Sequence, residues 1–560
     1  MTPADLVFTG GSLFTAGAAE SFPGAVAVRA GEIVAVGTAD EVAPLIGPAT
    51  EVVDTTGRLL LPGFQDAHVH PVQAGVELLQ CDLTGARDAA ECLERIGAYA
   101  AANPGEPWIL GAGWSMEFFE GGTPTAAALD AVVSDRPVLL SNRDHHGAWV
   151  NSRALEVAGI TADTPDPADG RIERAADGTP TGTLHEGAVG LVAALRPAPD
   201  DDLQYRGLLR AQQHLLSLGI TSWQDALVGS GLGMPDAFPV YLRAIAEGTL
   251  IARVAGALWW ERERGIEQLP GLLARRDRIA GLADAARMQM GTVKLMVDGV
   301  AENFTAAITS PYLDADGEPT DNAGLSFIAP AALAEYATAL DAAGFDLHFH
   351  ALGDRAVREA LDAIEAARAA NGATASRQHL AHLQIVAEGD VPRFAGLGAV
   401  ANLQPLWACH EPQLDELTLP FLQPELAGRQ YPFGDLARSG ARFAAGSDWP
   451  VSSADPLAGI RVAVTRLEPD AEPGTPPLGG LEQALDLATA FTAYTAGGAY
   501  VNRREDSTGR LEPGYRADLV VLDRDPFDGP PELLDDTRVL GTWVDGRRVY
   551  DSTMREQSTP

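Results

Sequence analysis

The fold is decided by a short stretch in which an apolar run leads into two histidines, Leu59-Leu60-Leu61-Pro62-Gly63-Phe64-Gln65-Asp66-Ala67-His68-Val69-His70. In an extended chain, side chains two positions apart project from the same face. His68 and His70 would therefore aim two imidazoles at one point. Because paired histidines also occur in protein cores, the meaning of this pair depends on the polar residues that follow.

Three such residues, His350, His382 and Asp448, each stand at the end of a later strand-like run. These runs alternate with alanine-rich helical stretches, a pattern typical of parallel strands joined by crossover helices in a barrel or a doubly wound sheet. Parallel barrel strands bring their carboxyl ends to one mouth, where barrel enzymes carry their chemistry. Imidazoles and a carboxylate that meet there are ligands suited to zinc or a related divalent ion.

Lys294 is the single lysine of the chain, so arginine supplies the other 39 of its 40 basic residues. An arginine is effectively always protonated, whereas a buried lysine can lose its proton and act as a nucleophile or base. The apolar run at residues 292–297 predicts a buried strand around it. We therefore expect Lys294 to have a role that a guanidinium cannot fill.

The two ends of the chain share a different pattern. Short β-branched runs broken by glycine occupy residues 1–58, and similar runs return in residues 505–560. Neither piece has enough strands to close a core alone, so we predict that both pair into one small β-sandwich. Residues 59–504 are then predicted to form the catalytic barrel, with an insertion near residues 72–200 that includes a Pro/Gly/Asp-rich loop or lid at 161–180.

Composition excludes some classes of function. The chain has 560 residues and a net charge of −37, which would repel phosphate backbones and anionic lipid surfaces, so we expect neither nucleic-acid nor membrane partners. No run approaches the ~18 apolar residues that a membrane span requires, and the N-terminus lacks the order of a secretory signal. The expected location is the cytoplasm. The three cysteines match no metal-ligand spacing and are interpreted as small buried hydrophobic residues.

Five motifs, in order along the chain, give a specific resemblance at residues 62–70, 144–152, 294–299, 350–356 and 446–451. They resemble those of the amidohydrolase superfamily and, within it, the branch of YtcJ-like and N-substituted formamide deformylase proteins. The resemblance covers nearly the whole chain and implies a (β/α)8 barrel with metal at its C-terminal face. The chain departs from the related motif at His145, where glycine is usual before the histidine that corresponds to His146.

The resemblance also implies a set of site residues. His68, His70 and Asp448 would hold one divalent metal, expected to be Zn²⁺, and His350 and His382 a second. Lys294 stands where related enzymes carry a carbamylated lysine that bridges both ions. Asp448 and Lys294 are therefore the predicted catalytic residues. The expected substrate contacts are His146, Trp114, Asp298 and Trp449, with Glu186 as a further candidate, while alternation along the strand predicts that His348 lies behind the ligands and His379 points elsewhere.

The resulting hypothesis is a metal-dependent hydrolase that cleaves a non-peptide carbon–nitrogen bond of a small molecule, such as an N-acyl or N-formyl amine, with metal-activated hydroxide. One alternative is a deaminase or an imidazolone-type hydrolase of cyclic amides, with one metal ion and Lys294 as a substrate contact. Another is a non-catalytic scaffold, but such relatives commonly lose ligands, whereas every expected position is filled here. Related enzymes are often dimers, so the resemblance also implies a homodimer.

Overall fold

The computed structural model describes residues 2–231, 233–282, 287–469 and 471–553. Its centre is a sheet of eight parallel strands in the order β21-β20-β19-β18-β17-β16-β15-β8. The strands are β8 (Phe64–Val69), β15 (Ile220–Val228), β16 (Arg253–Trp259), β17 (Met288–Met296), β18 (Asp346–Ala351), β19 (His379–His382), β20 (Val400–Leu403) and β21 (Arg442–Ala445). The predicted run around Lys294 is therefore strand β17, and every residue from Thr292 to Met296 in it is buried.

The first and last strands of this sheet lie next to each other and nearly close it. The Asn402 side chain donates a hydrogen bond to the Ala67 carbonyl at 2.9 Å, and the Asp448 amide donates to the His68 carbonyl at 2.7 Å. Gly446 is required here, because a Cβ at that position would lie 2.4 Å from the backbone nitrogen of His68. The eight-stranded barrel predicted from the sequence is confirmed.

Helices follow the barrel strands along the chain, as crossover connections require. The longer ones are α7 (Asp201–Ser217), α8 (Phe238–Ala246), α9 (Leu269–Ala280), α10 (Pro330–Ala342), α11 (Asp354–Asn371) and α16 (Pro456–Thr465). Asp200 caps α7 by accepting a hydrogen bond from the Leu203 amide, and a proline at the first turn begins α8, α9, α10 and α16. Strands such as β18 are buried along their whole length because packing covers both of their faces.

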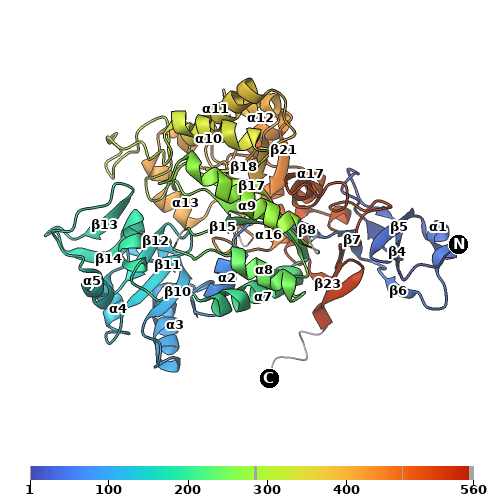
Figure 1. Ribbon diagram of the computed structural model, residues 1–560, viewed down its shortest axis with the longest axis horizontal. Helices are drawn as coiled ribbons and strands as arrows, with labels where there is room; N and C mark the ends of the chain where they lie inside the picture. The colour runs from blue at the N-terminus through green and yellow to red at the C-terminus, as the bar shows by residue number, and fades with distance from the viewer. Residues whose placement is uncertain (1, 232, 283–286, 470, 554–560) are drawn as a thin grey trace.

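The N-terminal and C-terminal segments pack together beside the barrel, toward the right of Figure 1. A six-stranded sheet combines β2 (Ser12–Leu13), β3 (Phe22–Pro23) and β7 (Leu59–Pro62) with β22 (Leu519–Leu522), β23 (Val539–Val544) and β24 (Arg547–Asp551). A four-stranded sheet contains β1 (Leu6–Thr9), β4 (Ala25–Arg29), β5 (Glu32–Gly37) and β6 (Glu51–Asp54).

One hydrophobic core joins the two terminal sheets. Phe8 of β1 packs edge-on against Trp543 of β23, with ring centroids 5.0 Å apart, and Leu60 and Val521 belong to the same buried cluster. The apolar run at residues 59–61, which the sequence placed at the start of the barrel segment, is strand β7 of this sandwich. The barrel begins only at Phe64.

The segment between β8 and β15 forms a third sheet, which lies at the lower left of Figure 1. Its strands are β9 (Cys81–Asp82), β10 (Ile109–Trp114), β11 (Val138–Asn142), β12 (Gly147–Val150), β13 (Gly170–Arg174) and β14 (Pro180–Glu186). The stretch at 161–180 was expected to be a loop or lid, but it contains β13, which pairs antiparallel with β14. This stretch is therefore partly regular structure.

The three cysteines and the possibility of a membrane-spanning helix were also considered from the sequence. Cys81, Cys92 and Cys409 are free thiols and all are buried, as expected for small hydrophobic residues. Within the described residues, no helix combines the length and the apolar character needed to cross a bilayer.

Candidate metal centre

The predicted ligands stand at the carboxyl ends of barrel strands. His68 lies in β8, and His70 follows it at the start of helix α2 (Pro71–Glu77). His350 is the second-last residue of β18, His382 ends β19, and Asp448 lies three residues beyond β21. Parallel strands place these ends at one mouth of the barrel.

Their side chains converge on one point. Asp448 Oδ1 lies 3.0 Å from His70 Nε2 and 3.2 Å from His68 Nε2, and Asp448 Oδ2 lies 3.8 Å from His382 Nδ1. The rings of His350 and His382 are 4.4 Å apart between centroids. His68, His382 and Asp448 each offer a ligand atom, and these atoms all lie within 4.8 Å of one another.

Several polar atoms of this cluster have no hydrogen-bond partner among the described residues. They are both ring nitrogens of His382 and Nδ1 of His70, and all of them are buried. A buried polar atom without a partner is destabilising, so native structures satisfy nearly all of them. Imidazole nitrogens with a carboxylate are a donor set typical of zinc and related divalent ions. The residues present therefore fit a divalent cation.

Lys294 reaches the same centre from β17. Its Nζ lies 3.4 Å from His68 Nε2, and the side chain is buried. Burial lowers the pKa of Lys294 to about 7, so much of it is the free amine near neutral pH. Burial and the neighbouring Lys294 in turn lower the pKa of His68 to about 3, which keeps its imidazole neutral.

A chain of hydrogen bonds behind His68 sets the orientation of its ring. His348 Nδ1 lies 2.6 Å from the Gln224 amide oxygen, which can only accept, so this nitrogen carries the proton. His348 Nε2 lies 2.9 Å from His68 Nδ1 and must then accept a hydrogen bond from it. His68 is left with a lone pair on Nε2, directed at Asp448. His348 thus lies behind the ligands, and His379 contacts Gln224 at 3.0 Å.

His350 is held in a similar way by Asp298. Asp298 Oδ1 lies 3.2 Å from His350 Nδ1, and its two oxygens also accept from three backbone amides. Burial raises the pKa of Asp298 to about 7, although these hydrogen bonds act against the rise. The sequence predicted a substrate contact here, but Asp298 has no exposed surface, so that assignment is corrected. Asp298 therefore fixes the orientation of the His350 ring through its Nδ1.

His146 pairs with Glu186, whose carboxylate oxygens lie 2.9 and 3.0 Å from its Nδ1. Burial acts to lower the pKa of His146, but the charge of Glu186 outweighs it and raises the pKa to about 9. The preceding His145 has φ of 64°, a left-handed conformation that glycine adopts without strain. This geometry explains why glycine is usual at that position of the related motif.

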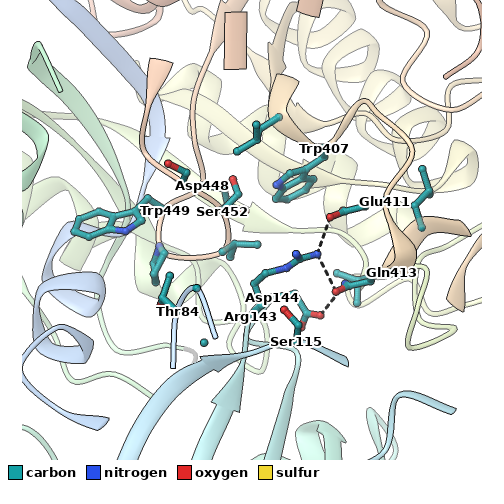
Figure 2. A pocket seen from close by; sticks show the side chains of 18 of the residues that line it. Thr84, Ser115, Arg143, Asp144, Trp407, Glu411, Gln413, Asp448, Trp449 and Ser452 are labelled. Carbon is teal, nitrogen blue, oxygen red and sulfur yellow. Dashed lines mark hydrogen bonds and ion pairs between the residues drawn. The ribbon is translucent and has the colours of Figure 1, made fainter. Parts of the chain in front are cut away.

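A cavity of about 620 Å³ opens above the centre, with Asp448, Trp449, His350 and His146 in its wall. Figure 2 shows Arg143 reaching across this wall to Glu411 and Gln413. Its guanidinium lies 3.1 Å from Glu411 and 3.0 Å from the Gln413 oxygen. The lining is strongly acidic, since carboxylates outnumber cations in it: Glu77, Asp82, Glu117, Asp144, Glu302, Glu411, Asp448 and Glu468.

The two tryptophans predicted as substrate contacts have different positions. Trp449 lines the cavity (Figure 2), with its ring 4.8 Å from that of His214. Trp114 instead packs in the core of the inserted sheet, where it is 1% exposed and donates from Nε1 to the Leu140 carbonyl at 2.9 Å. The substrate assignment for Trp114 is therefore corrected to a core role, because its strand turns the indole away from the cavity.

Trp407 lies parallel to the His382 ring at 5.3 Å between centroids. Arg143 and Gln413, which form the polar wall, were not found from the sequence. Arg143 directly precedes the motif at 144–152, which was the one available signal for it. Gln413 follows the turn after Trp407 and carries no local pattern that marks a site.

Comparisons with known proteins find relatives along nearly the whole chain. The chain is 31% identical over 558 residues to Protein LONG AFTER FAR-RED 3 of Arabidopsis thaliana, covering 98% of this chain and 92% of that protein. It is 30% identical over 561 residues to N-substituted formamide deformylase of Arthrobacter pascens, covering 98% and 99%. A solved structure of an uncharacterized metal-dependent hydrolase from Pyrococcus horikoshii superposes with a TM-score of 0.71 at 25% identity, covering 94% and 99%.

The family model for the amidohydrolases matches residues 51–550, from the last strand of the N-terminal sheet to the last strand of the chain. The match includes all eight barrel strands and every residue of the candidate metal centre. The resemblance drawn from the five motifs is confirmed, and the chain belongs to the amidohydrolase family.

Proposed function

We propose that this protein hydrolyses the carbon–nitrogen bond of a small N-acyl or N-formyl amine. The observation that carries the proposal is the convergence of four imidazoles, one carboxylate and the only lysine at the barrel mouth, with buried nitrogens that lack hydrogen-bond partners among the described residues. The relative from Arthrobacter pascens is named a deformylase of N-substituted formamides, which supports this choice of bond.

The metal ligands in this proposal are His68, His70 and Asp448 for one ion and His350 and His382 for a second. Lys294 would be the ligand shared by both ions as a carbamate, which forms when its neutral amine, favoured by the lowered pKa, adds to carbon dioxide and releases a proton. Divalent cations bound there polarise the substrate carbonyl and lower the pKa of water toward ~7. Zn²⁺ is the ion that this donor set favours.

The protein's own residues move the protons. Asp448 takes a proton from the attacking water and delivers it to the leaving nitrogen, a role that needs a carboxylate within reach of both. His146, charged through its pair with Glu186, donates a hydrogen bond to the carbonyl oxygen as negative charge develops on it. Trp407 and Trp449 cover the centre with apolar surface and reduce its exposure to bulk water.

The acidic wall of the cavity favours the product of this reaction. An amine released by hydrolysis takes up a proton near neutral pH and becomes a cation. Glu302 and Asp144 face the cavity close to each other, and burial together with Asp144 raises the pKa of Glu302 to about 7. Carboxylates placed in this way attract an ammonium group and disfavour substrates that carry a carboxylate.

A specific observation also favours a second candidate function. His68, His382 and Asp448 by themselves form a tight three-residue cluster, which is enough for a single ion. A single-ion deaminase or cyclic-amide hydrolase would use this cluster and keep Lys294 as an unmodified amine. The number of ions per chain separates the two functions.

The test combines elemental analysis of the purified protein with a release assay over N-substituted formamides, acetamides and cyclic amides. We expect two ions per chain and release of amine from at least one open-chain amide. Lys294→Ala should remove most of the bound metal and the activity. His410→Asn is a matched control, because His410 pairs with Asp415 outside the centre. Full metal content and turnover in Lys294→Ala would refute the bridging role.

A further inference from the structure

A small cavity of about 10 Å³ lies beside the candidate metal centre, between the start of helix α2 and strand β15. Its polar wall residues are His70, Gln73 and Asp225, and the rest of its wall is apolar. One buried water molecule needs a space of about 10–15 Å³. The cavity therefore has room for a single water molecule and little else.

The His70 ring has one nitrogen at the metal centre and one without a partner. Nε2 lies 3.0 Å from Asp448 Oδ1, whereas Nδ1 is buried and has no hydrogen-bond partner among the described residues. The two nitrogens stand on different edges of the ring, so Nδ1 faces away from Asp448. His70 is in the wall of the small cavity and is not in the wall of the large one, so the edge that carries Nδ1 borders the small cavity.

The chemistry of a histidine ligand requires an acceptor at this place. An imidazole that binds a cation through Nε2 keeps its proton on Nδ1, and this N–H nearly always has an acceptor. Two other candidate ligands already have a partner there, because His68 Nδ1 donates to His348 and His350 Nδ1 lies 3.2 Å from Asp298. The Nδ1–H of His70 needs an equivalent acceptor.

Asp225 is the carboxylate in the wall of the small cavity, and it is 1% exposed. Strand β15 places it opposite Val69 of β8, next to His70 in the chain. Its Oδ1 accepts from the Leu227 amide at 2.9 Å and its Oδ2 from the Tyr241 hydroxyl at 2.7 Å. A carboxylate can accept about four hydrogen bonds, so Asp225 can accept more. Burial raises the pKa of Asp225 and His70 acts against this rise, as expected for two groups that lie close together.

Gln73 limits what the cavity can hold. Its side-chain nitrogen lies 3.0 Å from Glu77 Oε1 and 3.0 Å from His145 Nδ1, so both amide hydrogens are in use and only the oxygen remains for a ligand. A molecule in the cavity must therefore accept a hydrogen bond from His70 and donate to oxygens. A water molecule does both, and a metal cation does not.

We propose that the small cavity holds one water molecule that links His70 Nδ1 to Asp225, and that Asp225 is thereby a positioning residue for this metal ligand. The inference rests on the metal centre of the proposed function and adds a residue that lies outside the five sequence motifs. The water accepts from the His70 N–H and donates to the carboxylate. This link fixes the orientation of the ring, and the negative charge behind it makes Nε2 a stronger ligand.

The test measures metal affinity by competition with a chelator, which needs no substrate. Asp225→Ala removes the acceptor, whereas Ala237→Val fills the cavity and keeps Asp225. Both variants should lower the affinity for Zn²⁺ by about 10–100-fold, the range for the loss of a partner behind a ligand. Tyr241→Phe is the matched control, because it removes the other side-chain hydrogen bond of Asp225. It should lower stability in urea denaturation and leave metal affinity unchanged.

A high-resolution crystal structure of the zinc-loaded parent protein tests the water without any variant. It should show one water within hydrogen-bond distance of both His70 Nδ1 and Asp225. A cavity without this water overturns the inference, as does parent-like affinity in either cavity variant or an equal loss in Tyr241→Phe.

The inference and the proposed function can fail separately. If affinity changes as expected but no amide is cleaved, the role of Asp225 stands and the proposed hydrolysis fails. If amides are cleaved and both cavity variants keep the affinity of the parent, the hydrolysis stands and the role of Asp225 fails.

Discussion

Replacing His348 with phenylalanine tests whether the orientation of a metal ligand is set from behind. His348 is fully buried and connects the Gln224 oxygen to His68 Nδ1 at 2.6 and 2.9 Å. The phenylalanine ring preserves the packing but leaves the His68 N–H without an acceptor. Two lost neutral hydrogen bonds and one stranded buried donor predict a loss of about 2–4 kcal/mol in the free energy of unfolding. Losing such an outer partner typically lowers metal affinity by about 10–100-fold.

His379→Phe is the matched control for this change. His379 is also fully buried and also contacts the Gln224 oxygen, at 3.0 Å, with its ring 4.3 Å from that of His348. The described contacts of His379 do not include His68, so its replacement should lower stability and leave metal affinity intact. Stability is measured by urea denaturation, and metal affinity by competition with a chelator of known strength. Equal metal affinity in His348→Phe and the parent protein, or an equal loss in both variants, would refute the reasoning.

Three further predictions concern other parts of the molecule. Asp545 forms ion pairs with Arg253 and Arg287, which outweigh the effect of burial and lower the pKa of its carboxyl group. The charge of Asp545 therefore stabilises the fold above pH ~4, and this contribution disappears as the pH falls through the lowered pKa. Asp545→Asn should therefore lose about 1–2 kcal/mol at pH 7 in urea denaturation, with the difference from the parent shrinking in acid; a difference independent of pH would contradict this. Trp114→Phe should lower stability by about 1 kcal/mol, through its bond to Leu140, and leave KM unchanged in steady-state assays. Lys294→Arg should abolish metal bridging, because a guanidinium stays protonated, and elemental analysis should then find at most one ion per chain.

The candidate ligands could be predicted because their positions follow from local rules. Alternation along a strand places His68 and His70 on one side, and parallel strands bring the ends that carry His350 and His382 together. Neither rule depends on details of packing. The rarity of lysine added an independent signal, since Lys294 lies in a run that is plainly a buried strand.

The sequence predictions were wrong where the direction of a side chain, or the sheet that a strand joins, depends on tertiary packing. Asp298 follows β17 and looks exposed beside a glycine, yet three backbone amides from later segments surround it. Trp114 ends β10, but the inserted sheet turns it inward. The apolar run at residues 59–61 was recognised as extended, but no local pattern says which sheet it joins.

Strand β7 has a consequence for how the protein is made. Leu60 of β7 pairs with Val521 of β22, more than 450 residues later, and only Gly63 separates β7 from β8, which contains His68. While the chain emerges from the ribosome, β7 can pair with β2 on one side but has no partner on the other side until β22 has been synthesised. The first histidines of the barrel mouth are thus fully anchored only then, so metal loading should follow synthesis of β22, and chains that stop before β22 should be targets for proteolysis.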